Sequence, residues 1–433
     1  MKTGFVITSS KQNYKPFRNQ PLGALYLQTI MEEEFGKNLE VSLLDLRAIN
    51  PDDAIYHVPE KDIYMYSITT LDYPDTERIV KEIRGIYPKA KHIAGGPHVE
   101  IFQKQSLNTF DAISLGEGEE SIKRIIKDYS ESNLKRIYRQ QEDIDISRYP
   151  IASRKYLPKS AVVDKSLLGK EYLNLNGTAA LFSRGCPFDC HFCSNLNYGK
   201  TKFRSPELIK KEINYLKKEY GIEALAIKDD NSIPVNRKTA QPFLEAIAQT
   251  GIKWRGQSRA NGIHSDMVKL AKESGCTEIA VGIESISEKV LKIINKHINF
   301  VQAKKYLKQL KKEGIDRRLL LITGLPGEPD NIVHKTINFI KEVEPSSVLL
   351  SLFCPLPGSE IHKNPQKFGI KINEKMDFDK YITAFGRFDE NEKPKAVFEY
   401  EKTTPFGKGK SMDKILEDHM KIQTFLKENN LIF

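Results

Sequence analysis

The sequence predicts an α/β protein built from a doubly wound parallel sheet followed by a partial barrel of six β/α units. Short apolar runs alternate with helical patterns along most of the 433 residues, and strands that alternate with helices form parallel sheets. Polar or glycine-containing loops follow many of these apolar runs. A chain of this length exceeds what one hydrophobic core usually organises, which favours two domains.

The first predicted domain covers residues 1–128. Doubly wound sheets bind their ligands beyond the carboxyl ends of the strands. Glycines in those loops let the backbone approach a flat or phosphate-bearing ligand, whereas tight turns of an ordinary α/β domain are the alternative explanation. The expected strands are Phe5–Thr8, Val41–Leu44, Ile63–Ile68, His92–Ala94 and Ala112–Leu115, and the expected helices are Leu22–Glu34 and Thr76–Ile86. The candidate ligand contacts are Ser67, Thr69, Gly95, Gly96, His98, Gly116 and Gly118.

The composition limits the classes of partner. Hydrophobic residues make up 39% of the chain and charged residues 29%, and no stretch approaches the ~18 consecutive apolar residues of a membrane span. The formal net charge is +10, but the charges are mixed, without a like-charge block or a stripe of basic and aromatic residues. We therefore expect neither a membrane nor a nucleic acid as partner.

The cysteines and the first residues indicate the compartment. Met1 to Ile7 lack the pattern of a signal peptide, so we expect a cytoplasmic protein. Of the five cysteines, none precedes residue 186 and three fall within eight residues. An odd, clustered set in an intracellular chain favours metal ligation over disulfides.

The cluster of cysteines lies in Ser183–Ser194, directly after an apolar run that predicts a buried strand, Thr178–Phe182. Cys186, Cys190 and Cys193 have the spacing Cys-x-x-x-Cys-x-x-Cys, and three thiolates on one short loop can converge on one side. A cubane iron–sulfur cluster takes soft cysteine ligands, normally ~4 of them. With three nearby, one iron stays open to another ligand.

A zinc site is the rival interpretation of this loop. Tetrahedral zinc usually takes a second Cys/His pair, whereas here the next cysteine is Cys276 and His264 stands alone. His191 is poorly placed as a fourth ligand because it lies between Cys190 and Cys193. Core cysteines without a metal fit badly with a polar loop that contains glycine and proline.

The second predicted domain, residues 176–360, is the partial barrel, whose chemistry belongs at the carboxyl ends of the strands. Polar groups occur there: Asp229-Asp230-Asn231, Ser258 to Asn261, Gly282 to Ser285, and Thr323 to Glu328. Its expected strands are Thr178–Phe182, Ala224–Lys228, Lys253–Gln257, Glu278–Gly282, Arg318–Thr323 and Ser347–Phe353. Its expected helices are Pro206–Tyr220, Lys238–Ala248, Ser265–Ser274, Phe300–Lys312 and Ile332–Val343.

Two segments flank this barrel. Residues 129–175 are polar and irregular, so we expect a linker that folds over the junction. Residues 361–433 form a C-terminal extension with a helical pattern from Ser411 to Lys427, and we expect this extension to cap the substrate mouth of the barrel. Aromatic residues precede the helix: Phe378, Tyr381, Phe385 and Phe388.

The cysteine loop, with Phe192 before its last cysteine, resembles the radical S-adenosylmethionine (radical SAM) superfamily. Pro21-Leu22-Gly23, the Gly-Gly-Pro-His from Gly95 and the Gly-Glu-Gly-Glu from Gly116 are similar to the cobalamin-binding domain that precedes many radical SAM cores. This resemblance spans residues 1–360. It implies a flavodoxin-like, cobalamin-binding-type domain plus a partial (β/α)6 radical SAM barrel. It also implies a 4Fe–4S cluster, S-adenosylmethionine and cobalamin as cofactors, and a reductant such as flavodoxin or ferredoxin.

One departure from the cobalamin-binding pattern concerns the cobalt ligand. Domains that ligate cobalt through the protein carry Asp-x-His-x-x-Gly after the first strand, but the loop from Ser9 to Gln20 contains no histidine. His92 to Gly95 matches His-x-x-Gly by accident, because Ala90 occupies the Asp position. We therefore expect a bound cobalamin without a histidine on its lower face.

The resemblance also implies contacts to S-adenosylmethionine. Asp229 or Asp230 would accept from the methionine ammonium, with a helix N-cap pair as the alternative. Arg259 would pair with the carboxylate and Glu284 with a ribose hydroxyl, unless these two form a salt bridge with each other.

Three further residues complete this set. Phe192 would cover the cluster or the adenine, and Gly324 would let the backbone approach the adenine. Cys354 would either donate a hydrogen atom or be a small buried hydrophobe.

Three functions remain as hypotheses. The first is a cobalamin-dependent radical methyltransferase acting on an unactivated carbon of a small molecule or peptide. The second is a radical SAM rearrangement, cyclisation or C–S cleavage, with cobalamin structural or absent. The third is a cobalamin or redox sensor. Cys276 and Cys354 are the only cysteines outside the loop, which argues against enzymes with an auxiliary cluster, such as methylthiotransferases.

Overall fold

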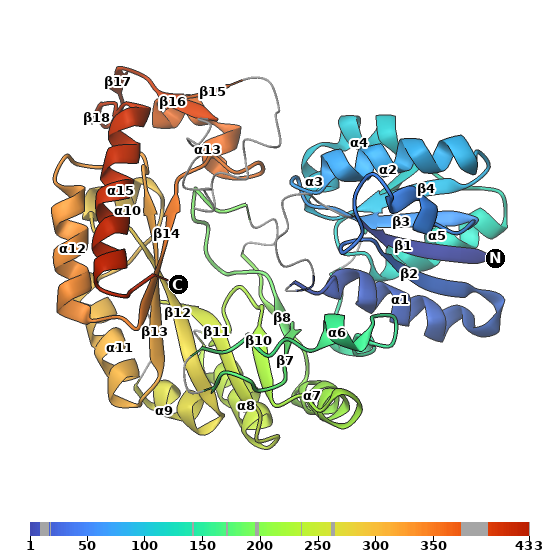
Figure 1. Ribbon diagram of the computed structural model, residues 1–433, viewed down its shortest axis with the longest axis horizontal. Coiled ribbons are helices and arrows are strands. Elements are labelled where there is room, and N and C mark those ends of the chain that lie inside the picture. The colour runs from blue at the N-terminus through green and yellow to red at the C-terminus, as the bar shows by residue number, and fades with distance from the viewer. Residues whose placement is uncertain are drawn as a thin grey trace. The chain divides into compact units, whose positions relative to one another are not determined.

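The structure, a computed structural model, describes residues 1–8, 17, 19–140, 143–169, 172–194, 199–234, 236–260, 265–373 and 397–432 (Figure 1). His264 and the aromatic residues Phe378, Tyr381, Phe385 and Phe388 of the sequence analysis lie outside these ranges. The chain divides into two compact units. One consists of Met1–Ser166, Asn176–Ala179 and Asn214–Ile222, and the other of Leu167–Leu175, Ala180–Ile213 and Glu223–Phe433.

The first unit contains a six-stranded parallel sheet with the order β2-β1-β3-β4-β5-β6. The order reverses between β1 and β3, which is the switch point at which doubly wound sheets bind ligands. The five expected strands are confirmed, whereas β6 comes from the segment predicted to be a linker. The strands are β1 Lys2–Ile7, β2 Glu40–Asp45, β3 Ile63–Ser67, β4 Lys91–Gly95, β5 Ala112–Leu115 and β6 Ile137–Arg139.

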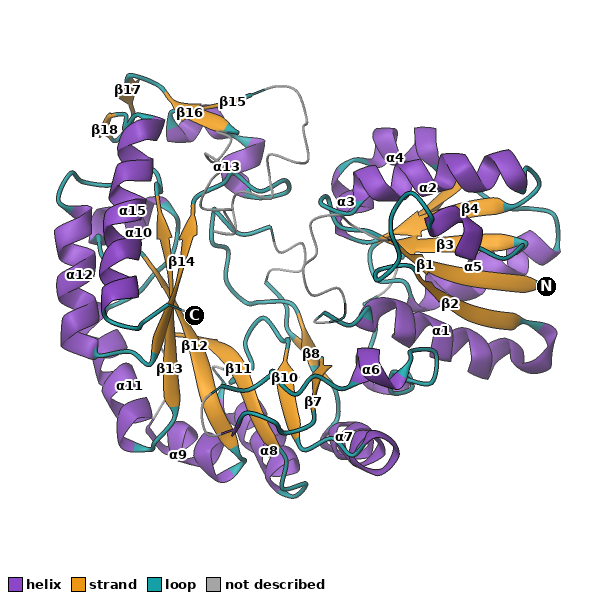
Figure 2. Cartoon of the chain, in the orientation of Figure 1, coloured by secondary structure: helices purple, strands orange, loops and turns teal. Residues whose placement is uncertain are grey.

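Helices cover both faces of this sheet, as Figure 2 shows. Helix α2 turns Ile79, Val80 and Ile83 inward at helical spacing, and its charged side chains are exposed or half-buried. Helices α1 and α5 share one apolar cluster with the strands. The helices are α1 Leu22–Phe35, α2 Tyr73–Ile86, α3 Pro97–Ile101, α4 Gln103–Thr109 and α5 Glu119–Ser130, and a short helix α6, Lys159–Val162, follows in the predicted linker.

A second parallel sheet has the order β14-β13-β12-β11-β10-β7 and curls into a half-barrel with helices on its outer side (Figure 2). All six expected strands and all five expected helices are present, with ends shifted by up to two residues, and α10 was not expected. The strands are β7 Gly177–Ala180, β10 Ala224–Ile227, β11 Lys253–Arg259, β12 Cys276–Glu284, β13 Asp316–Thr323 and β14 Ser347–Leu352. The helices are α7 Pro206–Tyr220, α8 Arg237–Ala248, α9 Ser265–Glu273, α10 Glu288–Ile293, α11 Phe300–Lys312 and α12 Ile332–Val343.

In its described residues, the C-terminal part of the chain adds two α-helices and two small antiparallel strand pairs to the second unit. Ser411 caps the N-terminus of α15 by accepting from the backbone N–H of Lys414, so the helix starts where the sequence predicts. The elements are α13 Glu360–Lys363, β15 Ile370–Ile372, β16 Phe398–Tyr400, β17 Thr403–Thr404, β18 Gly407–Lys408 and α15 Met412–Glu428. Among the described residues, no helix has the length and apolar character needed to cross a membrane.

Candidate cofactor site

The three clustered cysteines lie on a loop that leaves β8 (Ser183–Arg184) and ends before β9 (Lys202–Phe203), and these two strands pair antiparallel. Cys186 and Cys190 are half-buried and Cys193 is exposed, and all five cysteines of the chain are free thiols. The backbone N–H of Gly199 donates to the carbonyl of Cys186 (2.8 Å), and that of Cys193 donates to the carbonyl of Cys190 (3.0 Å). These bonds fold the loop back on itself, and it carries three free thiols, the type of donor that binds an iron–sulfur cluster.

Two nitrogen donors point at these sulfurs from the ends of barrel strands. Arg259, the last residue of β11, lies with Nη1 3.1 Å from Sγ of Cys190, and its guanidinium carbon is 3.9 Å from the centroid of the Phe188 ring. Asn231 follows β10 and donates from Nδ2 to Sγ of Cys186 over 3.7 Å. Hydrogen bonds to cysteine sulfur stabilise the thiolate and tune an iron–sulfur cluster, so the surroundings of the loop fit such a group.

His191, the fourth ligand that the zinc interpretation would need, is engaged with the backbone. Its Nδ1 lies 2.9 Å from the carbonyl oxygen of Ile293, and because a carbonyl only accepts, Nδ1 carries the proton. The backbone N–H of His191 donates to the carbonyl of Ile294 over 2.9 Å. Among the described residues, no three His, Cys, Asp or Glu side chains, the three loop cysteines included, form a group that could hold a metal ion. Metal-binding histidines also donate one ring N–H to a carbonyl, so this geometry does not separate zinc from a cluster.

The two aspartates after β10 have different surroundings. Asp229 is buried, its Oδ1 accepts from the backbone N–H of Phe182 (2.8 Å), and burial raises its pKa to about 7. This bond joins the loop after β7 to the loop after β10. Asp230 is exposed, so its carboxylate is the accessible one of the pair. The N-cap alternative is wrong, because Asn236 caps α8 by accepting from Lys238.

Glu284, at the end of β12, forms a buried ion pair that the sequence analysis missed. Its Oε1 lies 2.8 Å from Nζ of Lys296, and the two residues are 8% and 6% exposed. A Cβ at Gly282 would lie 2.6 Å from Oε1 of Glu284 and 2.9 Å from this Nζ, so glycine makes room for the pair. Glu284 thus pairs with Lys296, whereas the alternative predicted from the sequence was a salt bridge to Arg259. No local pattern distinguishes Lys296 from the other lysines.

Gly324 lies beneath the C-terminal extension. Its carbonyl accepts from the hydroxyl of Tyr400 over 2.8 Å, and a Cβ in its place would come within 2.7 Å of Ile415 on α15. Its φ of 86° also favours glycine. The extension therefore packs against the carboxyl end of β13, and this packing leaves no room for a side chain at position 324.

The candidate contacts of the first unit lie at or after the carboxyl ends of β3, β4 and β5, which are neighbours in the sheet. Ser67 and Thr69 are exposed, and Thr69 donates its hydroxyl to Asp72 (2.7 Å). Gly96 has a φ of 98°, and a Cβ there would lie 2.8 Å from the carbonyl oxygen of Ile68, so glycine is needed for the close approach of two loops. Gly95 ends β4 next to this contact.

The remaining glycines of this set lie after β5. Gly116 is exposed, has a φ of 81° and donates its N–H to Glu100 over 2.8 Å. Gly118 precedes α5, and a Cβ there would lie 3.0 Å from the side chain of Leu27. The structure thus brings five of the seven candidates to exposed or half-buried positions at one edge of the sheet, and the sixth, Gly118, to the start of a helix.

The seventh candidate, His98, lies in the core. It belongs to α3, is fully buried, and stacks on Tyr73 with ring centroids 4.2 Å apart. Burial lowers the pKa of His98 to about 4, so the imidazole is neutral. His92 is also fully buried, within β4, and its Nδ1 is 2.9 Å from the hydroxyl of Tyr66, which agrees with its interpretation as a strand residue.

Cys276 and Cys354 lie inside the protein. Cys276 opens β12 and is 1% exposed, and Cys354, just after β14, is 7% exposed. Burial raises the pKa of Cys354 to about 12. Both thiols have the surroundings of small core residues.

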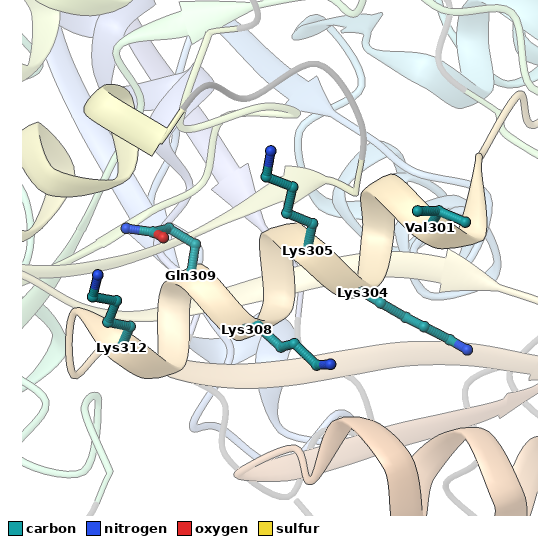
Figure 3. Close-up of a pocket in the computed structure, with 6 residues that line it drawn as sticks. All are labelled: Val301, Lys304, Lys305, Lys308, Gln309 and Lys312. Carbon is teal, nitrogen blue, oxygen red and sulfur yellow. The ribbon is translucent and has the colours of Figure 1, made fainter.

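A surface cavity of about 430 Å³ lies on α11, and Figure 3 shows the side chains that line it. None of them belongs to the predicted site. Lys304, one of the four lysines, is 2.7 Å from Glu342. The lining residues are Val301, Lys304, Lys305, Lys308, Gln309 and Lys312. This cavity is a basic, solvent-facing helix surface and adds nothing to the cysteine loop.

Comparison with known proteins gives a family match for each of the two units. Residues 181–340 match the Radical SAM superfamily, and residues 16–126 match the B12 binding domain. The chain is 29% identical over 356 residues to the uncharacterized methyltransferase PH0819 of Pyrococcus horikoshii, which covers 79% of this chain and 77% of that protein. It is 25% identical over 319 residues to the anaerobic magnesium-protoporphyrin IX monomethyl ester cyclase of Cereibacter sphaeroides, which covers 69% of this chain and 52% of that protein.

Among solved structures, the fold is similar to that of the radical SAM methyltransferase TsrM from Kitasatospora setae, a structure with cobalamin and a 4Fe–4S cluster bound. The TM-score is 0.73 at 14% identity, over 100% of this chain and 90% of that chain. The cofactors of the two matched domains are a 4Fe–4S cluster with S-adenosylmethionine and cobalamin. The chain belongs to the radical SAM enzymes that carry a B12-binding domain.

Proposed function

We propose that this enzyme methylates an unactivated carbon of a small molecule or peptide by cobalamin-dependent radical chemistry. The observation that carries the proposal is the combination in one chain of the three-thiol loop, with N–H donors on two of its sulfurs, and a doubly wound B12-binding domain. The relative from Pyrococcus horikoshii, which carries the name methyltransferase, supports it. Chemistry of this kind requires both cofactors, and the chain has a domain for each.

In this proposal Cys186, Cys190 and Cys193 bind the cluster. When bound, the cluster and S-adenosylmethionine supply a 5′-deoxyadenosyl radical, and cobalamin supplies the methyl group. Arg259 and Asn231 donate to the ligating sulfurs and thereby stabilise their negative charge. The donor set, thiolate with neighbouring N–H groups, suits iron better than an oxygen-preferring cation.

Other strand-end residues would bind and orient S-adenosylmethionine. Asp230 presents an exposed carboxylate that can accept from its ammonium group, while Asp229 keeps the strand ends of β7 and β10 together. Glu284 would bind S-adenosylmethionine only together with Lys296, because its carboxylate already forms an ion pair with that lysine. Phe192 would cover the cluster or the adenine, and Gly324 contributes a backbone position beneath the C-terminal extension.

Cobalamin would bind at the exposed edge of the first sheet. Ser67 and Thr69 offer hydroxyls, and backbone groups of Gly95, Gly96, Gly116 and Gly118 lie in the neighbouring loops. His98 has no place in this proposal, because its ring is fully buried against Tyr73. A histidine ligand to cobalt is therefore not expected from this edge.

Radical cyclisation without methyl transfer is the second candidate function. The observation that favours it is the similarity to a relative named as a cyclase, at 25% identity. Both functions require a low-potential electron donor such as flavodoxin or ferredoxin. Both also require a reducing compartment, which we take to be the cytoplasm, because the three thiols must stay reduced to bind iron.

The two functions are separated by anaerobic reconstitution followed by product analysis. We expect ~4 iron atoms per chain, a bound corrinoid spectrum after addition of hydroxocobalamin, and formation of both 5′-deoxyadenosine and S-adenosylhomocysteine under strong reductant. A cluster without retained corrinoid, or 5′-deoxyadenosine without S-adenosylhomocysteine, would favour cyclisation or rearrangement. A chain that binds zinc at one atom per chain and leaves S-adenosylmethionine intact would refute both.

A further inference from the structure

The loop that carries the cysteines is hydrogen-bonded to the end of a helix that the sequence pattern did not predict. Helix α10 stops at Ile293, and its last carbonyls lack partners within the helix. The carbonyl of Ile293 accepts from Nδ1 of His191, and the carbonyl of Ile294 accepts from the backbone N–H of the same residue, each over 2.9 Å. His191 thus bridges two open carbonyls at the helix end.

The residues after α10 form a Schellman motif that turns back onto the same loop. The backbone N–H of Lys296 donates to the carbonyl of Leu291 (2.8 Å), and that of Asn295 donates to the carbonyl of Lys292 (3.2 Å). Asn295 has a φ of 54°, the left-handed position of this motif, which glycine or asparagine usually occupies. This turn aims the amide of Asn295 at the cysteine loop, where Nδ2 lies 2.6 Å from the carbonyl oxygen of Asp189.

Two further contacts hold the loop. Nζ of Lys296 lies 5.9 Å from the centroid of the Phe192 ring, within the range of a cation–π contact, while its charge is balanced by Glu284. From another side, the backbone N–H of Ile361 donates to the carbonyl of His191 over 3.0 Å. Each of Asp189, His191 and Phe192 therefore has a partner outside the loop, and these residues flank Cys190 and precede Cys193.

We propose that the segment Ile293–Lys296 is a clamp that holds the cysteine loop in the geometry needed by the cluster, and that Asn295 is a positioning residue of this clamp. The inference rests on the proposed function in that it requires the three thiols to bind a cluster. Asn295 acts through the carbonyl of Asp189 and not through iron or sulfur. Removing its amide loosens the loop and leaves the ligands in place.

The Schellman motif allows a clean test of the amide. Asn295→Gly keeps the left-handed position, which glycine favours, and removes only the donor to Asp189. Asn295→Asp keeps the shape and replaces the donor by an acceptor. Asn299→Gly is the matched control, because Asn299 caps α11 by accepting from Gln302 and the same substitution four residues later removes a hydrogen bond outside the loop.

The measurements are the rate of iron transfer from the reconstituted holoenzyme to a ferrous chelator and the EPR spectrum of the reduced cluster. Loss of a hydrogen bond of ordinary strength costs about 1.4 kcal/mol, which corresponds to about a tenfold change in a rate or equilibrium constant. We expect iron loss about tenfold faster in Asn295→Gly and Asn295→Asp, a broadened EPR spectrum as the loop samples several positions, and wild-type behaviour in Asn299→Gly. Thermal unfolding of the three variants without iron should stay close to that of the wild type.

The outcomes separate this inference from the function on which it rests. Wild-type protein that takes up no cluster refutes the proposed function. If the wild-type protein binds a cluster but the Asn295 variants lose iron at the wild-type rate and show the wild-type EPR spectrum, the clamp alone is overturned. Equal acceleration in Asn295→Gly and Asn299→Gly also overturns it, because general stability would then account for the effect.

Discussion

Arg259 and Cys190 are 69 residues apart in the sequence, yet Nη1 of the arginine lies 3.1 Å from Sγ of the cysteine. The arginine ends β11, so the register of a barrel strand decides where the donor meets the loop. The same guanidinium stacks on Phe188, which limits its rotation. A single cation thus contacts the sulfur of Cys190 and the ring of Phe188, two residues before it.

The first prediction concerns the reduction potential of the cluster. A cation that donates to a ligating sulfur favours the more negative, reduced cluster, so Arg259→Gln should make the midpoint potential more negative. A tenfold change in the one-electron equilibrium is about 59 mV, and we expect a shift of about this size. The potential is measured by redox titration without S-adenosylmethionine, since Arg259 is also a candidate for binding that cofactor. Arg255→Gln, on the same strand with its Nη1 3.9 Å from Glu278, should leave the potential unchanged. Equal potentials in wild type and Arg259→Gln would contradict the assignment.

The second prediction concerns the cysteines themselves. Replacement of Cys186, Cys190 or Cys193 by serine should reduce the iron content after reconstitution from ~4 atoms per chain to a small fraction, because each residue supplies one of three thiolates. Cys276→Ser is the control, since that thiol is buried at the start of β12 and should not affect iron binding. Iron, sulfide and visible absorption give the measurement. A loop variant that keeps a full cluster would exclude that cysteine as a ligand.

The third prediction concerns the loop after β4. Gly96 has φ 98° and ψ 179°, a region open almost only to glycine, and a Cβ would meet the backbone of Ile68. Gly96→Ala should lower the free energy of unfolding by about 1–3 kcal/mol and weaken hydroxocobalamin binding. Gly85→Ala is the same change inside α2 at a position with open space around the Cβ, and it should raise stability by roughly 0.5–1 kcal/mol. Denaturant unfolding and corrinoid titration test both variants, and an unperturbed Gly96→Ala would show that the two loops can separate.

The fourth prediction concerns pH and the C-terminal extension. Burial raises the pKa of Glu328 from its ordinary 4.5 to about 7, although Lys410 lies 3.6 Å away and pairs more closely with Asp418 at 2.7 Å. A carboxyl group with a raised pKa binds its proton more tightly in the folded chain, so stability falls as the pH rises from about 4.5 to about 7.

Glu328→Gln imitates the protonated group. Near pH 4 the variant and the wild type should have the same free energy of unfolding. At pH 8 that of the variant should be higher by up to roughly 3 kcal/mol. Glu417→Gln, on α15, is the control of opposite sign, because hydrogen bonds from Lys421 and Lys414 lower the pKa of Glu417 to about 2, so its contribution is lost in acid. Denaturant unfolding at several pH values measures both. A pH-independent difference for Glu328→Gln would contradict the raised pKa.

The regular elements were predictable because strands buried on both faces are continuous apolar runs and the helices between them are amphipathic. Strand β6 was missed since it has three residues, of which Tyr138 alone is buried. Helix α3 was missed because its start looked like a binding loop, although Pro97 after Gly96 is also a common beginning of a helix. His98 was therefore taken for a loop residue, whereas it lies buried in this helix.

By itself, the sequence determined the order of strands and helices, the two domain types and the three thiols, since each of these is written in residues that are close together along the chain. The tertiary structure decided what touches those thiols. Arg259, Asn231 and Asn295 reach the cysteine loop from 69, 45 and 106 positions away, and the pairing of Glu284 with Lys296 depends on a space left by Gly282. Such contacts follow from strand register and helix ends, which a local pattern of residues does not specify.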